Sequence, residues 1–316
     1  MAKVFVASTV PPFNPALGHV YGDTERFLRC AAADRVKTHQ HTRDAAKADI
    51  VLFIGSKNPD LSDVLAHPLA TQDRERCFIF HMGDRIVPRM PGVYTCLEAG
   101  WHHPGRTRAG HYTQVAEYSH CTPRDGSSPP GFLYTFLGRC ATHPIRQRIA
   151  TLNNPRGLVL DTSPASGASP VAPDQYAHAM CSGLFALCPR GFGSSSFRLF
   201  EAMRLGRAPV IISDAWVPPE GPQWSAFSVR IPESQIDSLP ERLAALEREA
   251  LTMGMLASEA YANWFAQDVT FHRVVEWCLA IQGDRRWPER LLRLGVTLRL
   301  CSPRRLLARI MGHGCG

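Results

Sequence analysis

The chain has 316 residues, of which 45% are hydrophobic and 20% are charged, and its formal net charge is +7. This composition excludes a disordered protein, and the length is sufficient for two domains of ordinary size. No run of about 18 apolar residues predicts a membrane span, and the first residues do not resemble a signal peptide. We therefore expect a cytoplasmic protein whose positive charge favours anionic ligands.

The first half of the chain alternates strand-like apolar runs with helical segments, which is typical of an α/β fold with parallel sheets. Strands are expected at residues 3–8, 49–55 and 77–83, with a helix over 23–34. The stretch CTPRDGSSPPG (121–131) concentrates Pro, Gly and Ser, as in an exposed connection. We place the end of an N-terminal Rossmann-like domain there and assign it residues 1–125.

The second half repeats the pattern and predicts a second Rossmann-like domain over residues 126–275. Its strands are expected at 132–138, 157–162, 184–189, 208–213 and 226–231. The stretch SPASGASPVAP (163–173) is a surface loop by composition, and residues 239–265 are strongly helical. Ten cysteines show neither a C-x-x-C pair nor zinc-site spacing, so we expect reduced thiols.

The last segment, residues 276–316, is predicted to be a basic amphipathic tail. From Arg285 onward, arginines are interleaved with Leu, Ile, Val and Trp. Such a helix can lie on an anionic membrane, here the inner face of the cytoplasmic membrane. The alternative is a helix packed against the protein with its arginines in water.

The stretch CPRGFGSSSFRLFEAMRLG (188–206) predicts a strand, a tight turn and a helix, with the turn at the carboxyl edge of a sheet. Gly191 and Gly193 allow close approach of the backbone to a ligand. The next three residues, Ser194, Ser195 and Ser196, can cap the helix and donate hydrogen bonds. Because the N–H groups of a first helical turn attract phosphate, we expect this loop to hold an anion.

Charged residues flank the same loop. Arg190 and Arg198 carry guanidinium groups suited to bidentate phosphate contact, and Glu201 lies three residues after Arg198. A carboxylate there can accept hydrogen bonds from ribose hydroxyls. The alternative is an ion pair between Arg198 and Glu201 on a solvated helix face.

The stretch CPRGFGSSSFRLFEAMRLGRAPVIISDAW (188–216), followed by WSAFSVRIPE (224–233), resembles the signature of the exostosin (GT47) family of glycosyltransferases. TFLGRCATHPIRQRI (135–149) is similar to the segment that opens the family's nucleotide domain, and residues 38–53 resemble the family more weakly. The resemblance implies a GT-B fold, in which two Rossmann-like domains face a central cleft and the C-terminal domain binds a nucleotide sugar. It also implies an inverting transfer, with a UDP-sugar as donor and a saccharide or glycolipid as acceptor, in polysaccharide synthesis.

The chain has no D-x-D carboxylate pair that could hold a divalent metal against the diphosphate, so we expect neither metal nor cofactor. Fixed positive charge would do that work instead. Arg190, Arg198 and Arg139, with the helix N-terminus, would stabilise the charge that develops on the departing diphosphate.

A general base is required to take the proton from the acceptor hydroxyl. Asp84, which follows a strand-like run, is the first candidate, and His81 is the second. His19, Asp23 and Glu25 are alternatives after the first strand. The His- and Arg-rich stretch AGWHHPGRTRAGHY (99–112) has no metal-ligand spacing and is assigned to acceptor binding or to loop structure.

Two other classes of function stay open. A catalytically inactive glycosyltransferase-like scaffold or partner subunit would carry the same strands and much of the same loop. A nucleic-acid-binding protein is disfavoured because the chain shows no helix-turn-helix, zinc-finger or RNA-binding motif.

Overall fold

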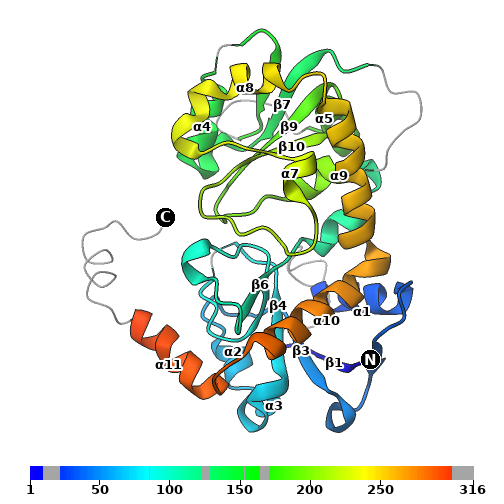
Figure 1. Cartoon of the computed structure of the whole chain (residues 1–316), viewed down its shortest axis with the longest axis vertical. Coiled ribbons are helices and arrows are strands. Elements are labelled where there is room, and N and C mark those ends of the chain that lie inside the picture. Colours follow the sequence, from blue (N-terminus) through cyan, green and yellow to red (C-terminus); the bar gives the residue numbers. More distant parts are fainter. Residues whose placement is uncertain (10–21, 85, 122–128, 153, 164–170, 301–316) are drawn as a thin grey trace. The chain divides into compact units, whose positions relative to one another are not determined.

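The computed structural model describes residues 1–316 except 10–21, 85, 122–128, 153, 164–170 and 301–316. The chain forms two compact units (Figure 1), of which unit 1 contains residues 1–110 and 271–316 and unit 2 contains residues 111–270. This division differs from the boundaries expected at residues 125 and 275. The composition signal for the first boundary, at 121–131, falls largely on residues outside the described ranges.

Unit 1 is built on a six-stranded parallel sheet with the order β2-β1-β3-β4-β5-β6. Its strands are β1 (Lys3–Ala7), β2 (Gln40–Thr42), β3 (Ile50–Ile54), β4 (Cys77–His81), β5 (Gly92–Tyr94) and β6 (Thr107–Ala109). Every residue of β3 is fully buried, as expected for a central parallel strand covered on both faces. The unit's helices are α1 (Asp23–Ala33), α2 (Ser62–Leu65), α3 (Pro68–Gln72), most of α10 (Gln267–Asp284) and α11 (Glu289–Leu300).

The segment predicted as a separate tail begins inside unit 1. Helix α10 buries Val274, Cys278 and Ile281, and the ring of Phe271 lies 5.9 Å from that of Phe27 on α1. The tail prediction is therefore wrong for residues 276–284, because their apolar side chains complete the core of unit 1. Residues 301–316 lie outside the described residues.

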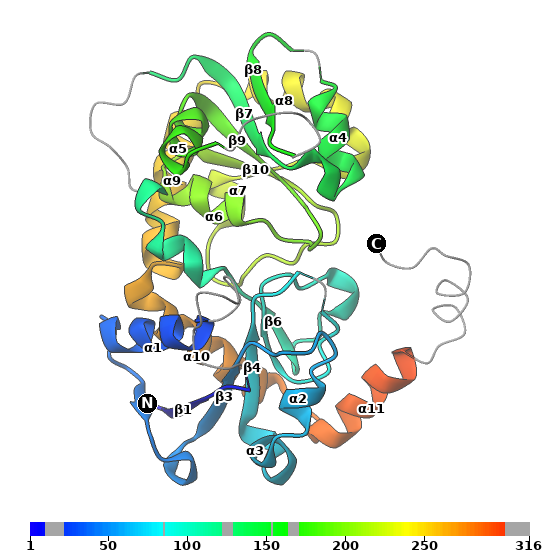
Figure 2. The same cartoon turned by 180° about the vertical axis from the view of Figure 1, so that it is seen from behind.

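Unit 2 is a five-stranded parallel sheet with the order β11-β10-β9-β7-β8. The strands are β7 (Phe132–Gly138), β8 (Gly157–Asp161), β9 (Gly183–Pro189), β10 (Ala208–Ile212) and β11 (Val229–Arg230). The helices are α4 (Pro144–Ala150), α5 (Pro173–Cys181), α6 (Phe197–Arg204), α7 (Trp224–Phe227), α8 (Leu239–Ala245) and α9 (Ala250–Trp264), and they surround this sheet (Figures 1 and 2).

Short 3-10 turns complete both units. They are η2 (Ala45–Lys47), η3 (Arg74–Arg76), η4 (Ala99–Trp101), η5 (Thr113–Glu117), η6 (Ser119–Cys121), η7 (Cys140–Thr142) and η9 (Glu233–Ser238). Among the described helices, none combines the length and the apolar character that a bilayer crossing requires. The eight cysteines of the described ranges are free thiols.

The two glycines Gly206 and Gly254 fix how α6 ends against α9. Gly206 follows α6 with φ of 67°, the left-handed conformation expected at a helix C-terminus. A Cβ atom on Gly254 of α9 would lie 2.2 Å from the carbonyl oxygen of Gly206. The close approach of these two backbones holds α6, and therefore the loop before it, against the body of unit 2.

Candidate functional site

The strand order of unit 2 creates a switch point between β7 and β9. From β7 the chain moves outward to β8 on one side, and then to β9 and β10 on the other. In open parallel sheets, ligands bind outside the carboxyl ends of the strands at such a point. Arg139 follows β7 directly and Arg190 follows β9, so both predicted donor-site arginines lie at this edge.

Arg146 on α4 fixes the loop that carries Arg190. Its guanidinium donates to the carbonyl oxygens of Arg190 (2.8 Å), Pro189 (3.1 Å) and Arg139 (3.4 Å). We call these three hydrogen bonds from Arg146 the clamp. A Cβ atom on Gly191 would lie 2.9 Å from Nη2 of Arg146, so glycine at this position leaves room for the guanidinium to make them. Sequence reasoning missed Arg146, although it lies in the segment 135–149 that resembles the family.

The three serines of the loop are buried: Ser194, Ser195 and Ser196 expose only 2%, 5% and 8% of their surface. Ser196 is the N-cap residue of α6, but its side chain makes no capping hydrogen bond, so that part of the prediction is wrong. The carbonyl of Ser194 accepts a bond from Oγ of Ser213 at 2.7 Å instead. Oγ of Ser195 has no hydrogen-bond partner among the described residues.

Arg198 is buried beneath the loop rather than exposed beside it. Its Nη2 donates to the carbonyl oxygen of Leu137, and its guanidinium carbon lies 4.8 Å from the ring centre of Phe136. Nε and Nη1 have no hydrogen-bond partner among the described residues. Burial opposes the charge of Arg198, but Tyr176 and Glu201 outweigh it and raise the pKa. The guanidinium is therefore permanently positive.

Glu201 is buried with Arg198. It is 6% exposed, and the hydroxyl of Tyr176 donates to its Oε2 at 2.8 Å. Burial raises the pKa of Glu201, while Arg198 and the Tyr176 hydrogen bond oppose this rise. The alternative of an ion pair on a solvated helix face is therefore wrong, because neither side chain is in water.

Further polar residues occupy the same edge of the sheet. Burial, followed by the charge of Arg190, lowers the pKa of His143, which caps α4 by accepting the N–H of Ile145 at 3.2 Å. The backbone N–H of Asp214 donates to Glu233 at 3.1 Å, and the N–H of Glu233 donates to Asp214 at 3.0 Å. These loops are therefore held by their own hydrogen bonds around the arginines.

In unit 1, the candidate bases lie at the carboxyl end of β4, where His81 is the last residue of the strand and Asp84 follows it. Nδ1 of His81 accepts the N–H of Gly83 at 3.0 Å, and burial lowers the pKa of His81 to about 4. Asp84 is exposed within this unit, and Sγ of Cys96 lies 3.9 Å from its Oδ1. His81 is a neutral imidazole at physiological pH, and Asp84 is a carboxylate accessible to solvent.

The alternative bases near the first strand are less well placed. Asp23 forms an ion pair with Arg26 at 2.5 Å within α1, and Glu25 lies in the first turn of the same helix. His19 lies outside the described residues.

The switch point of the unit 1 sheet was missed by sequence reasoning. The strand order places it between β1 and β3, and Thr9 and Ser56 follow these strands. Both hydroxyls donate to Asp63, which also accepts the N–H of Lys57 at 2.8 Å. Burial acts to raise the pKa of Asp63, but these hydrogen bonds outweigh it and lower the pKa. Asp63 thus ties the two loops together as a carboxylate.

The His- and Arg-rich stretch 99–112 is largely structural. His111 is fully buried, its Nε2 lies 3.0 Å from Oγ1 of Thr270, and burial lowers its pKa to about 3. The loop part also bonds to itself, since Arg106 and Thr107 donate their backbone N–H groups to the carbonyl of His103, both at 2.8 Å.

Two groups of potential metal ligands occur among the described residues, and neither suits a metal as it stands. In the first, Nδ1 of His39 accepts the N–H of Ala2 at 3.2 Å, so Nε2 carries the proton and donates to Glu276 at 2.7 Å. That nitrogen has no lone pair to offer. The second joins His120 and Cys121 to Glu201, and burial raises the pKa of Cys121 to about 12, which favours thiol over thiolate.

Unit 2 thus has the features of a nucleotide-binding Rossmann-like domain: a parallel sheet, a switch point lined by arginines, and a serine-rich loop before a helix. Residues 114–246 match the family model of the exostosin GT47 domain. The predicted resemblance to this family is therefore confirmed over residues 114–246. The predicted fold class of two Rossmann-like parallel α/β units is likewise confirmed.

Two further similarities to known proteins were found. The chain is 36% identical over 76 residues to an Exostosin-1 homolog of Caenorhabditis elegans, a match that covers 23% of this chain and 20% of that protein. The crystal structure of MurG from Acinetobacter baumannii aligns with a TM-score of 0.33 and 10% identity, over 88% of this chain and 99% of that one. The chain thus matches only a fifth of the length of the curated relative.

Proposed function

We propose that the chain is an inverting, metal-independent glycosyltransferase that moves a sugar from a nucleotide diphosphate sugar to a saccharide or glycolipid acceptor. A UDP-sugar is the first donor to test. The observation that carries the proposal is the switch point of unit 2, where Arg139 and Arg190 follow neighbouring strands. The exostosin GT47 domain spans this edge.

The chemistry of the departing group explains why arginines would matter there. Breaking the bond between sugar and diphosphate leaves negative charge on phosphate oxygens, and fixed cations stabilise this charge without reorganising. Arg190 would contact the diphosphate, and the clamp formed by Arg146 would hold it in position. Arg198 adds a buried, permanently positive charge behind the loop, which would favour a nearby phosphate through its electric field.

The proposal that transfer needs no metal rests on the residues that could stabilise the diphosphate in place of a metal ion. The sequence has no D-x-D pair, and the switch point carries arginines. Full activity should therefore persist in excess EDTA. Loss of activity in EDTA and its recovery with manganese would refute this part of the proposal.

The proton of the acceptor hydroxyl must also be removed. His81 ends β4 and Asp84 follows it, at the carboxyl edge of the unit 1 sheet. The carboxylate of Asp84 is exposed, whereas Nδ1 of His81 already accepts the N–H of Gly83. We propose Asp84 as the base and His81 as the second candidate.

The direct test is a thermal-shift screen of the whole chain against UDP-, GDP-, dTDP- and CMP-sugars. A donor present at a hundredfold excess over its Kd should stabilise the protein by about 2.7 kcal/mol. Arg190→Ala should remove most of this shift, whereas the control Arg156→Ala, whose exposed side chain pairs with Glu247, should retain it. A chain that binds donor but neither transfers nor hydrolyses it would be an inactive scaffold.

A further inference from the structure

Helix α11 and the chain before it present an apolar face to solvent. Trp287 is 63% exposed, Leu291 49% and Leu294 57%. Leu291 and Leu294 are three residues apart on α11 and therefore share one face of the helix, which Arg290 flanks. Large apolar side chains gathered at one place on a surface generally mark a binding surface.

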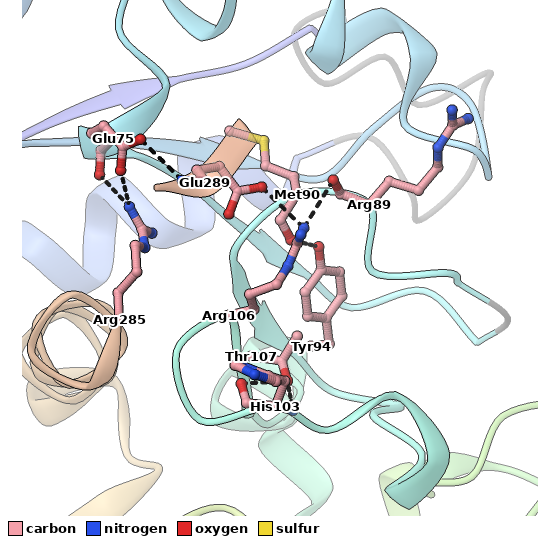
Figure 3. A network of polar contacts seen from close by, with 9 residues as sticks. All are labelled: Glu75, Arg89, Met90, Tyr94, His103, Arg106, Thr107, Arg285 and Glu289. Carbon is pink, nitrogen blue, oxygen red and sulfur yellow. Dashed lines mark hydrogen bonds and ion pairs between the residues drawn. The ribbon is translucent and has the colours of Figure 1, made fainter. Parts of the chain in front are cut away.

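This face belongs to the arm, by which we mean residues 285–296. Polar contacts hold the start of the arm to the rest of unit 1 (Figure 3). The guanidinium of Arg285 donates to the backbone carbonyl of Glu75 at 3.0 Å and to the carboxylate of Glu75 at 2.8 Å. The same carboxylate accepts the backbone N–H of Glu289 at 3.0 Å. Arg106 pairs with the carboxylate of Glu289 at 3.1 Å. The guanidinium carbon of Arg285 lies 5.5 Å from the ring centre of Phe78.

Positive charge gathers beside the same helix. Arg74, Arg89 and Arg293 come from three separate stretches of the chain and line one small recess together with Met90, Pro91 and a single carboxylate, Glu289. Burial, followed by the charges of Arg74 and Arg89, lowers the pKa of Arg293. Like charges repel one another at such short range, so this recess is suited to a negatively charged group.

The arm carries almost no compensating negative charge. Residues 285–296, whose side chains are described, contain four arginines and a single acidic residue, Glu289. Glu289 is 3% exposed and faces Arg106 rather than solvent. The exposed part of the arm therefore combines apolar and cationic side chains.

We propose that the outer face of this arm, formed by Trp287, Leu291 and Leu294 with Arg74, Arg89, Arg286, Arg290 and Arg293, docks onto a bilayer of anionic phospholipid. The apolar side chains enter the interfacial region, and the arginines contact headgroup phosphates. Because the arm is already folded onto unit 1, little ordering entropy is lost on binding. This inference is independent of the proposed transfer reaction, because that reaction can be measured separately with a soluble donor and a soluble acceptor.

The test is co-sedimentation of the full chain with vesicles of phosphatidylcholine, alone or mixed with phosphatidylglycerol. Binding is expected only to the mixed vesicles, and it should weaken as salt is added. Arg290→Gln combined with Arg293→Gln should weaken binding about thirtyfold, since each arginine near an anionic surface contributes about a factor of five. Leu291→Ser combined with Leu294→Ser should also release the protein.

A matched control lies on α9, where Leu251 and Met255 are 54% and 61% exposed. Leu251→Ser combined with Met255→Ser removes similar apolar surface and should leave vesicle binding unchanged. Vesicles should also shift tryptophan emission to the blue in the native chain and not in Trp287→Phe, because Trp287 would leave water. All variants are compared by circular dichroism to confirm folding.

Three outcomes would overturn the proposal. The first is equal binding to vesicles with and without phosphatidylglycerol, or equal loss of binding in the α9 control. The second is full displacement from vesicles by inorganic phosphate at matched ionic strength, which would assign the recess to a soluble anion. The third is that sedimentation velocity detects a dimer of the native chain and a monomer of the variant that combines Leu291→Ser with Leu294→Ser. That result would assign the face to a second copy of the chain.

Discussion

The guanidinium of Arg198 lies directly against Gly138, and a Cβ atom at residue 138 would fall 2.4 Å from Nη2 of Arg198. The same nitrogen donates to the carbonyl of Leu137, so it cannot move away without losing that bond. Gly138 is thus the position on β7 that leaves space for a buried cation under the donor loop.

Gly138→Ala should displace Arg198 and lower the free energy of unfolding by about 1–3 kcal/mol, the usual cost of overpacking. Donor affinity should fall on the order of tenfold. Gly131→Ala is the control, because a Cβ atom there meets nothing within 4 Å. In an Arg198→Ala background the Gly138→Ala penalty should largely vanish, and an unchanged penalty would show that Arg198 is not its cause.

Arg146→Ala should destabilise unit 2 by about 2–3 kcal/mol and weaken donor binding, because three carbonyl oxygens of the loops lose a charged donor. Arg148→Ala on the same helix removes an exposed pair with Asp237 and an exposed hydrogen bond to the carbonyl oxygen of Glu233, and it should change stability by less than about 0.5 kcal/mol. Urea unfolding and donor titration of both variants compare the two effects. Equal behaviour would mean that Arg146 does not position the loop.

Tyr176→Phe should cost about 1–3 kcal/mol, because it leaves the buried carboxylate of Glu201 without its hydrogen-bond donor. Tyr134→Phe offers a matched control. The hydroxyl of Tyr134 is buried but has no hydrogen-bond partner among the described residues, so its removal should be neutral or stabilising. Chemical denaturation measures both, and a smaller loss for Tyr176→Phe than for Tyr134→Phe would contradict the assignment.

The attachment of the arm should depend on pH. Burial raises the pKa of Glu289 from 4.5 to about 7, with Arg106, Arg285 and Arg293 opposing this rise and Glu75 adding to it. Between pH 4.5 and about pH 7, Glu289 therefore binds more protons when the arm is attached than when it is detached. Its attachment is strongest below about pH 4.5 and weakens, on the order of 3 kcal/mol, as pH rises through 7.

Hydrogen exchange of residues 289–296, corrected for the intrinsic rate, measures this attachment at pH 5.5 and pH 8. Protection should fall at the higher pH in the native chain and be nearly constant in Glu289→Gln. Exchange of α1 in the same samples is the internal control. A native chain whose α11 protection does not change would contradict the prediction.

Asp84→Asn should lower turnover by about two to four powers of ten and leave donor affinity unchanged, because a general base acts on the proton of the acceptor. His81→Ala, His19→Ala and Asp23→Asn are measured beside it. If His81 is the base instead, turnover should fall as pH drops through about 4, where this imidazole becomes protonated. Near-native turnover in all four variants would place the base elsewhere.

The central strands could be predicted from sequence because their signal is local. Continuous apolar runs such as IVLFI (50–54) and FLYTFLG (132–138) agree with the observed strands within one residue at each end. Strands β2, β5 and β6 were missed, since each has three residues and exists only through pairing with a neighbour. The predicted helix over 239–265 is two helices separated at residues 246–249.

The candidate site was predictable in part for a similar reason. The positions of Arg139 and Arg190 follow from the strands before them. The clamp formed by Arg146 and the burial of Arg198 depend on contacts between distant elements, such as Arg198 with Leu137, that no local pattern records. Burial also differs between His81, which is half-buried, and Asp84, which is exposed, although only two residues lie between them in the sequence.

Unit 1 is discontinuous in the chain, and this has a consequence for biosynthesis. Residues 111–270 emerge from the ribosome as a complete unit, whereas unit 1 must wait for Phe271 and the rest of α10. Until then, Phe27 contacts Phe80 but lacks Phe271, and His39 lacks Glu276, 237 positions further along. Premature termination near residue 270 should therefore leave a folded unit 2 attached to unfinished, aggregation-prone residues 1–110.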